Sequence, residues 1–390
     1  MKDLATALDK LRQEHLFRIR NISSAAQQIE PIINGQKVLS FCSNDYLGLA
    51  NHPKITAALI DGAKKYGVGT GASHLITGHH KSHHALEEEL AEFIGCERTL
   101  LFSSGYMANL GVVSALANRD TTVFEDRLNH ASLVDASILA RAQLKRYKHL
   151  DTNELDKKLI DEKNAAKFIL SDGVFSMDGT ITPVTGLQAL ANKHDTKLII
   201  DDAHGIGVLG KEGKGCTENQ LATETILIGT LGKAFGTFGA FVAADKDTIE
   251  WCIQRARTYI YTTALPPSLA DATRASLRLV RKESWRRERL QSLIMRFRTH
   301  ADQVGLPITN STTPIQPIII GSSATALKIS ADLLSKGIIV SAIRPPTVAQ
   351  NSARLRISFS ATHTKDHVDQ LIELLAEIIK SNNMSLQQDS

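Results

Sequence analysis

Short apolar runs rich in β-branched residues alternate with helical patterns through the middle of the chain. The clearest runs are residues 121–124, 167–170, 197–201 and 225–228. Strands that alternate with helices at this spacing form a mostly parallel sheet that is covered on both faces, with right-handed crossovers. The pattern therefore predicts an α/β fold that is built on such a sheet.

Polar residues directly follow two of these runs. Asp201 and His204 end one run, and Thr230 and Lys233 follow the next one among glycines. Open α/β sheets bind ligands at the carboxyl ends of their strands, so these side chains should share one rim. They suit pyridoxal phosphate, because a lysine can bind the aldehyde, an aspartate can keep the ring nitrogen protonated, and a histidine can donate to the phenolic oxygen. Taken singly, each of them is equally well explained as a loop or turn residue.

Further candidates follow other strand-like runs. Gly105 opens a helix after residues 99–102, and the free N–H groups of a helix N-terminus bind anions, so we expect the cofactor phosphate there. Tyr106 lies either in that site or in the core. His130 could stack on a flat ring or cap the helix that begins near residue 132, and Ser176 could bind a ligand oxygen or complete a turn.

The chain is longer than a single hydrophobic core usually requires, at 390 residues. We expect an N-terminal helix with short strands over residues 1–50, a large cofactor-binding domain over 51–285 and a small C-terminal domain over 286–390. Leucines at helical spacing over residues 3–20 predict an amphipathic first helix, with Arg18 near its end.

Two arginines of the expected C-terminal domain alternate along one strand. Arg354 and Arg356 share a strand face, from which a guanidinium could clamp a substrate carboxylate in bidentate fashion. The alternative is a solvated basic edge. Asn44, in a turn-rich stretch, could likewise be a site residue or only a turn residue.

Charge and cysteine usage exclude several classes of protein. The 45 basic and 41 acidic residues are scattered without a basic block, so nucleic acid is not an expected partner. The four cysteines form no C-x-x-C pair, which favours a reducing compartment and argues against structural zinc. No apolar run is long enough to span a bilayer. We expect a cytoplasmic protein without a membrane partner.

Two motifs offer alternatives to this interpretation. The histidines of residues 79–84, with Glu87 and Glu88 one turn on, have a spacing that could hold a metal, and a metal-dependent hydrolase is one alternative. We nevertheless expect no metal site, because no separate ligand set completes it. Residues 205–211 resemble a phosphate-binding loop, but Glu212 stands where Ser or Thr must bind magnesium, which disfavours a nucleotide-binding module.

Several motifs together resemble the α-oxoamine synthase family of pyridoxal phosphate enzymes. They are Ser43-Asn-Asp-Tyr-Leu-Gly48, Asn129-His-Ala-Ser132, Asp172-Gly-Val-Phe-Ser-Met-Asp-Gly179, Asp201-Asp-Ala-His-Gly205 and Gly229-Thr-Leu-Gly-Lys233. The resemblance covers nearly the whole chain. It implies the aspartate aminotransferase fold, a homodimer with its active site at the subunit interface, and decarboxylative joining of an amino acid to an acyl thioester.

The same resemblance assigns roles to individual residues. Lys233 would bind the cofactor aldehyde, Asp201 would hold the ring nitrogen, and His204 would contact the phenolic oxygen. His130 would stack on the ring. The other implied cofactor contacts are Gly105, Tyr106, Ser176, Thr230 and, toward the phosphate of the partner subunit's cofactor, Thr262 or Thr263.

One short segment selects a branch of the family. Arg344-Pro-Pro-Thr347 resembles the branch that joins L-alanine to a pimeloyl thioester, carried by coenzyme A or an acyl carrier protein, in biotin synthesis. The sister branch, which joins glycine to acetyl-CoA, usually has a tyrosine before a single proline here. The implied substrate-binding residues are Arg18, Asn44, His130, Arg344, Thr347 and Arg356. The chain departs from common family patterns at His74 and Asp172.

Overall fold

The computed structural model describes the backbone of residues 3–218 and 224–388. These residues form two compact units. The large unit comprises Leu49–Ser176 and Ile181–Arg287, and the small unit comprises the residues up to Gly48, Met177–Thr180 and the residues from Glu288 onward. The N-terminal and C-terminal segments therefore belong to the same unit. Among the described residues, no helix is both long enough and apolar enough to cross a lipid bilayer.

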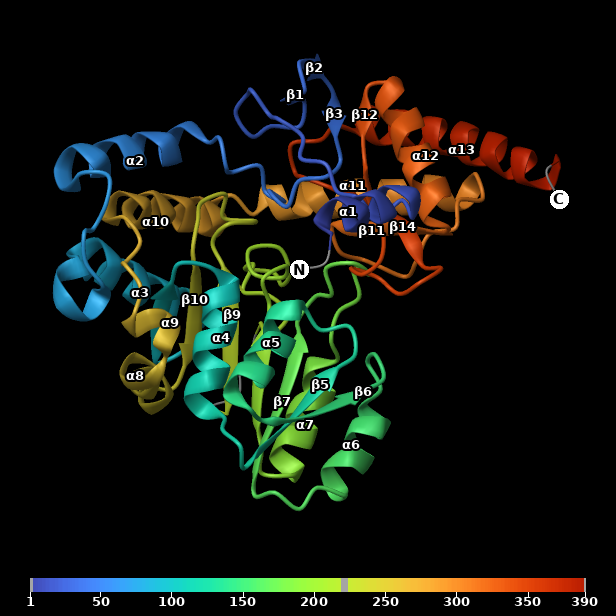
Figure 1. Ribbon diagram of the computed structural model, residues 1–390. Coiled ribbons are helices and arrows are strands. Elements are labelled where there is room, and N and C mark those ends of the chain that lie inside the picture. Colours follow the sequence, from blue (N-terminus) through green and yellow to red (C-terminus); the bar gives the residue numbers. More distant parts are fainter. Residues whose placement is uncertain (1–2, 219–223, 389–390) are drawn as a thin grey trace. The chain divides into compact units, whose positions relative to one another are not determined.

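A seven-stranded sheet forms the centre of the large unit (Figure 1). In spatial order its strands are β4 (Arg98–Phe102), β10 (Ala240–Ala244), β9 (Thr225–Thr230), β8 (Lys197–Asp201), β7 (Ala166–Asp172), β5 (Thr121–Asp126) and β6 (Gln143–Tyr147). Strands β9, β8, β7, β5 and β6 run parallel, whereas β10 is antiparallel to both of its neighbours. This mostly parallel sheet confirms the predicted α/β fold class.

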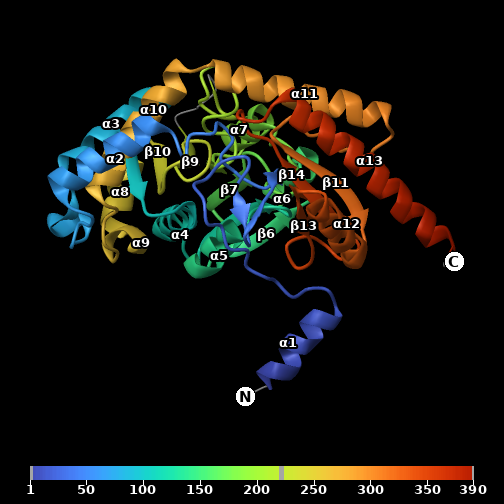
Figure 2. The same cartoon turned by 90° about the horizontal axis from the view of Figure 1, so that it is seen from above.

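Helices cover both faces of this sheet. Helices α4 (Gly105–Leu116) and α5 (Ala131–Ala140) lie on one face and α7 (Val184–Lys193) lies on the other (Figure 2). Val112 of α4 and Leu133 of α5 belong to one buried apolar cluster with Ile199 and Ile226 of the strands. Because the sheet is covered on both sides, its strands are apolar at nearly every position, and this explains the continuous apolar runs in the sequence.

The remaining helices of the large unit pack around this centre. They are α2 (Pro53–Tyr66), α3 (Lys81–Ile94), α6 (Thr152–Ile160), α8 (Lys246–Arg255), α9 (Arg257–Ile260) and α10 (Pro267–Lys282). Between α2 and α3 lies η1 (His74–Gly78), a single π-helical turn.

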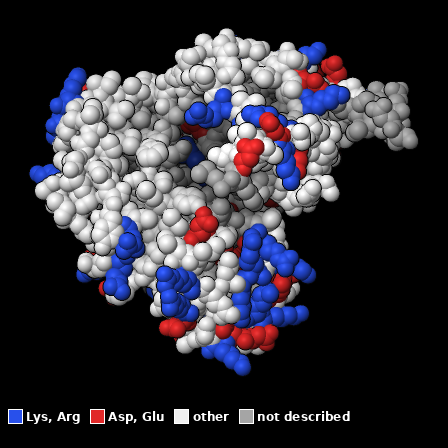
Figure 3. Space-filling model, in the orientation of Figure 1, with Lys and Arg blue, Asp and Glu red and all other residues white. Residues whose placement is uncertain are grey.

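On the face drawn in Figure 3, the charged side chains of the described residues occur in small, separate groups of either sign.

The small unit is built on a three-stranded antiparallel sheet. Its spatial order is β11 (Ile315–Gly321), β14 (Ala353–Ser358) and β13 (Ser341–Ile343). Strand β12 (Ile338–Ile339) pairs in parallel with β3 (Leu39–Ser40), and β1 (Ile32–Ile33) pairs with β2 (Gln36–Lys37). Its helices are α1 (Leu4–Gln13), most of α11 (Trp285–Gln303), α12 (Ser323–Ser335) and α13 (Lys365–Gln388).

The first helix is shorter than the sequence pattern predicts. Helix α1 begins after Asp3, whose side chain accepts a hydrogen bond from the Ala5 N–H, and it ends at Gln13. His15 then adopts φ +57°, a left-handed conformation that cannot continue an α-helix. The expectation that the helix reaches residue 20 is therefore wrong, and Arg18 lies beyond it in a segment that is neither helix nor strand.

Candidate functional site

A cavity of about 220 Å³ lies at the carboxyl ends of β7, β8 and β9, where α4 and α5 begin. Its walls include eight residues that the sequence singles out. These are Gly105, Tyr106, His130, Ser176, Asp201, His204, Thr230 and Lys233. Ser132, Asp172, Val174 and Ala203 complete the lining. The sheet thus brings an amine, carboxyl groups, imidazoles and a helix N-terminus to one place.

Lys233 enters the cavity from the turn after β9. The Leu231 N–H donates to the Gly239 carbonyl and the Gly236 N–H donates to the Lys233 carbonyl, so the turn is closed by its own backbone. Lys233 Nζ lies 2.9 Å from His204 Nε2, within hydrogen-bond distance. The amine and the imidazole that follow neighbouring strands therefore meet, as parallel pairing of β8 and β9 requires.

Asp201 is held at the end of β8 by two hydrogen bonds. Its Oδ2 accepts from Asn109 Nδ2 at 2.6 Å, and its Oδ1 accepts from the Ala203 N–H at 3.0 Å. Asn109 is fully buried in the second turn of α4 and also donates to Ser132 Oγ at 2.8 Å. Asn109 is not among the residues that the sequence patterns indicate; the signal that points to it is an amide on a mainly apolar helix, one turn after Gly105.

A hydrogen-bond chain fixes the orientation of His130. Since Ser132 Oγ accepts from Asn109, its hydroxyl proton is free to donate to His130 Nδ1, 2.7 Å away, and the Ser132 N–H also donates there at 3.3 Å. His130 therefore caps α5, which is one of its two predicted roles, and it also lines the cavity; its stacking on a cofactor ring stays a prediction. Burial lowers the pKa of His130, although the charge of Asp201 opposes this effect. In the neutral ring, the proton then resides on Nε2.

Asp172, at the end of β7, is a buried carboxyl group with one oxygen that accepts no hydrogen bond from the described residues. Its Oδ2 accepts the His130 N–H at 3.1 Å, whereas Oδ1 has no hydrogen-bond partner among the described residues. Burial and the neighbouring Asp201 charge raise the pKa of Asp172. A polar ligand in the cavity would satisfy this oxygen, because a buried polar atom without a partner is costly.

Helix α4 offers its N-terminus to the same cavity. Ser104 caps the helix by accepting the Met107 N–H at 3.2 Å, and the next residues, Gly105 and Tyr106, line the cavity. Apart from its own helix backbone and its chain neighbours, no atom of the described residues lies within 4 Å of the place where a Cβ of Gly105 would be, so an anion can approach the backbone. The Tyr106 hydroxyl is bonded to Asp135 on α5. Thr230 Oγ1 donates to the Gly239 carbonyl at 3.1 Å and accepts the Gly232 N–H.

These groups fit pyridoxal phosphate, the cofactor that the sequence resemblance implies. Asp201 supplies a carboxylate that is already oriented by Asn109, Lys233 supplies the amine, and Gly105 opens an anion-binding helix end. The unsatisfied oxygen of Asp172 indicates that the cavity is completed by a polar ligand.

Two predicted phosphate ligands lie outside this cavity. Thr262 and Thr263 follow α9 in the large unit and are not part of the cavity wall. The resemblance assigns them to the cofactor of a partner subunit, so their role stays a prediction.

The predicted substrate-binding residues apart from His130 belong to the small unit and form two groups. Arg18 Nη2 donates to Thr347 Oγ1 at 3.4 Å, and Arg344 Nη1 donates to the His15 carbonyl at 2.5 Å. In the second group, Arg356 Nη2 donates to Asn44 Oδ1 at 3.1 Å.

The paired strand arginines are buried in the small unit. Arg354 is 7% exposed and forms an ion pair with Asp178 at 2.6 Å, and Arg356 is 6% exposed. The alternative of a solvated basic edge is therefore wrong. Burying a guanidinium is tolerated because each of them donates to several oxygens.

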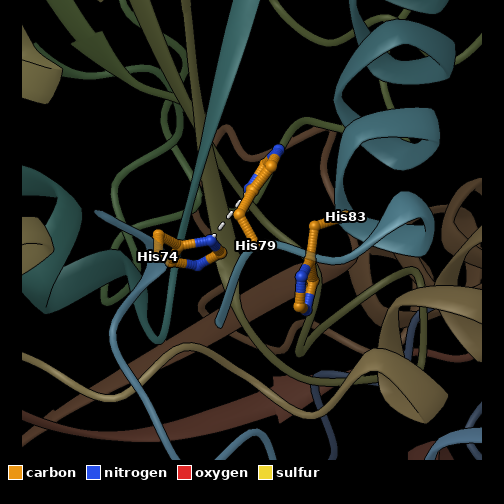
Figure 4. A group of neighbouring side chains, drawn as sticks. All are labelled: His74, His79 and His83. Carbon is orange, nitrogen blue, oxygen red and sulfur yellow. Dashed lines mark hydrogen bonds between the residues drawn. The ribbon is translucent and has the colours of Figure 1, made fainter. Parts of the chain in front are cut away.

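Histidines also gather away from the cavity, between η1 and α3. Figure 4 shows that His74, His79 and His83 lie close together, with His74 Nδ1 3.1 Å from His79 Nδ1. Burial lowers the pKa of His74 to about 3 and that of His83 to about 4, so both rings are neutral at physiological pH. None of the three lines the cavity.

We expect Asn109→Leu to weaken pyridoxal phosphate binding by about tenfold or more, because Asp201 and Ser132 lose their shared donor while the branched shape and the number of heavy atoms of the side chain are kept. Titration of the apo chain with the cofactor, followed by absorbance, measures the dissociation constant. The control is Asn118→Leu, in the turn after α4, which should leave the affinity unchanged. Equal affinity of the Asn109 variant and the parent chain would contradict the positioning role.

Asp202 generates a prediction about pH. Burial raises its pKa to about 7, and its Oδ2 accepts the Cys216 N–H at 2.8 Å. Because this folded-state pKa lies above the unfolded value, the stability that it contributes is lost as pH rises through about 7. The unfolding free energy of the chain should therefore fall relative to that of Asp202→Asn between about pH 4 and 7, by up to about 1.4 kcal/mol per pH unit, and the difference should level off above about pH 8. Denaturant titrations at several pH values measure this, and parallel curves for the two chains would refute it.

Comparison with known proteins places the chain in a family. Residues 36–375 match the family Aminotransferase class I and II. An 8-amino-7-oxononanoate synthase of Nitrosococcus oceani is 53% identical over 376 residues, which cover 95% of this chain and 100% of that protein. These relatives do not support the alternative of a metal-dependent hydrolase.

Solved structures agree with this placement. The serine palmitoyltransferase of S. paucimobilis, solved with bound PLP, has a TM-score of 0.92 at 27% identity and covers 98% of both chains. The 8-amino-7-oxononanoate synthase of Francisella tularensis has a TM-score of 0.78 at 34% identity, covering 89% of this chain and 99% of that one. The chain therefore belongs to the aminotransferase class I and II family, and its relatives within that family include the 8-amino-7-oxononanoate synthases.

Proposed function

We propose that this chain joins L-alanine to a pimeloyl thioester, with loss of carbon dioxide and release of the free thiol, to give 8-amino-7-oxononanoate for biotin synthesis. The observation that carries the proposal is the meeting of Lys233, His204 and Asp201 at one cavity. The 53% identity to a synthase of that name, over its full length, supports the choice of reaction.

Pyridoxal phosphate is the cofactor that this proposal requires. When bound, it supplies a protonated aromatic ring that accepts the electron pair of a carbanion. Lys233 Nζ would hold its aldehyde, the Asp201 carboxylate would hold its ring nitrogen, and the N–H groups of Gly105 and Tyr106 would hold its phosphate.

The chain's own side chains would then move one proton and stabilise one developing charge. Lys233, once its amine is free, takes the proton from Cα of alanine as a general base, and His204 Nε2 at 2.9 Å accepts a hydrogen bond that orients this amine. The Nε2–H group of His130 donates a hydrogen bond to the thioester carbonyl oxygen as negative charge builds there. The hydrogen-bond chain from Asn109 through Ser132 keeps that proton on Nε2.

Both proposed substrates carry a carboxylate, and the small unit supplies guanidinium groups. We assign substrate binding to Arg18, Asn44, Arg344, Thr347 and Arg356. Arginine suits this role because its planar group binds a carboxylate through two parallel hydrogen bonds.

A homodimer is part of the proposal. The loop after α2 and the turn after α9 lie side by side, because the Ala264 N–H donates to the Ala72 carbonyl at 3.0 Å. These two segments and the η1 turn beside them expose Val68 (86%), Ile76 (76%) and Tyr261 (72%). Large exposed apolar side chains on neighbouring segments are typical of protein interfaces. A second copy that covers them would also bring Thr262 and Thr263 to an interface.

We place the protein in the cytoplasm, with coenzyme A or an acyl carrier protein as the thiol carrier. The four cysteines are free thiols in the structure, as expected in a reducing compartment.

We expect the purified chain, supplied with pyridoxal phosphate, to release thiol and form 8-amino-7-oxononanoate from L-alanine and a pimeloyl thioester. Mass spectrometry of the product, with coenzyme A and carrier-protein donors tested in parallel, identifies the carrier. Lys233→Ala should abolish turnover, since no other group supplies that amine, whereas Lys211→Ala, an exposed lysine in a neighbouring loop, should not change it.

Product formation from glycine and acetyl-CoA, with no reaction of any pimeloyl donor, would overturn this choice and favour the sister reaction. A Lys233→Ala variant that retains turnover would remove the proposed chemistry altogether.

The dimer proposal predicts that Ile76→Asp converts the protein from dimer to monomer, because a carboxylate buried at an interface without a partner is costly. Light scattering coupled to size-exclusion chromatography measures the mass. Ile138→Asp, on α5, is the matched control, because Ile138 is 63% exposed and lies on another surface; it should stay dimeric. A parent chain that runs as a monomer at micromolar concentration would contradict the dimer.

A further inference from the structure

Two groups of metal-ligand side chains share His79, in the segment that joins η1 to α3. One group is His74, His79 and His83 (Figure 4), and the other is His79, His84 and Glu87. Within each group the ligand atoms lie within 4.8 Å of one another. The hydrogen bonds of each nitrogen decide which group can bind an ion.

The first group is committed to other bonds. His83 Nδ1 accepts the His80 N–H at 3.0 Å, and its Nε2 donates to the Leu265 carbonyl at 2.8 Å. Both ring nitrogens are therefore used, and a metal ion would have to break a bond to the backbone. His74 stacks on Tyr259, with ring centroids 5.0 Å apart, and its Nδ1 meets His79 Nδ1. His74 and His83 thus form the support for His79 and do not complete a metal site.

In the second group, the ligand atoms of His79 and Glu87 lie close together. His79 Nε2, the nitrogen that His74 does not touch, lies 3.9 Å from Glu87 Oε2. This separation is too long for a hydrogen bond and only slightly longer than the roughly 3.3–3.6 Å between two ligand atoms of a tetrahedral ion, so a small side-chain rotation would bring both atoms onto one ion. If His79 Nδ1–H donates to His74, then Nε2 presents a lone pair to the carboxylate, and two acceptors face each other.

The two inner ligands are held in place and the outer one can adjust. Glu87 is anchored because its Oε1 accepts the Leu101 N–H at 3.0 Å, and its side chain is 12% exposed. His84, in the first turns of α3, is 65% exposed and sits 3.5 Å from Glu88. A rotation of this exposed ring closes the remaining gap to a bound ion. Hydrogen bonds that orient the metal-coordinating side chains in this way are usual around protein metal ions.

We infer that His79, His84 and Glu87 bind one zinc-like divalent transition-metal ion, with water at its fourth position. Two imidazoles, a carboxylate and water are a common zinc ligand set, with metal–ligand distances of about 2.0–2.2 Å. The ion would tie the segment before α3 to the first two turns of that helix. It has no catalytic part in the proposed reaction, because none of the three ligands lines the cavity of Lys233.

The test uses the full chain loaded with pyridoxal phosphate, titrated with zinc chloride in a calorimeter. We expect one site per chain, a melting temperature that rises with zinc and falls back on adding a chelator, and at least about tenfold weaker binding in His84→Gln. The matched control is His300→Gln, since His300 is also a partly exposed histidine beside a carboxylate, 3.4 Å from Asp369. It should bind zinc like the parent chain.

X-ray absorption at the zinc edge separates this site from adventitious binding to a thiol, because it should show nitrogen and oxygen ligands without sulfur. A second variant, Glu87→Gln, should weaken zinc binding in the same way. Because Glu87 is largely buried this variant could fail to fold, whereas His84→Gln changes an exposed side chain and keeps the test valid. The inference is overturned by the lack of saturable binding, by sulfur in the first coordination shell, or by equal zinc affinity of His84→Gln and the parent chain.

Discussion

Parallel pairing of β7, β8 and β9 is the constraint on which the rest of the site depends. The register places Asp172 opposite Asp201, and Asp201 opposite Ile228, two residues before the end of β9. Because the strands end together, the polar residues that follow each strand must share one rim. Lys233 and His204 then meet without a long loop to order. The buried apolar cluster beneath α4 and α5 holds the strands in this register.

The same rim concentrates groups that a protein interior tolerates poorly. Asp172 and Asp202 are buried carboxyl groups, each with one oxygen that has no partner among the described residues. Burial raises the pKa of both, so the neutral acid is favoured and the cost of placing them beside Asp201 is reduced. Such perturbed groups are typical of sites that perform proton transfer. Asn109 donates a hydrogen bond to Asp201 Oδ2 and fixes the position of this carboxyl group at the same rim.

Sequence patterns predict the parts of this molecule that local rules determine. The apolar runs identify the central strands, and the polar residues after them identify Asp201, His204 and Lys233, because strand direction alone brings strand ends together. Contacts between distant segments were not predictable in this way. The Asn109–Asp201 bond joins residues 92 positions apart, and the burial of Arg354 depends on Asp178, 176 positions away. The early end of α1 reflects a single left-handed residue, His15, which leucine spacing does not reveal.

The most direct test of the central claim is borohydride reduction of the purified chain with pyridoxal phosphate, followed by peptide mapping. The account predicts one stably modified lysine, Lys233, because among the lysines that the structure describes only this one lines the cavity with Asp201 and His204. Modification of another lysine, or none, would contradict the claim that these strand ends form the cofactor site.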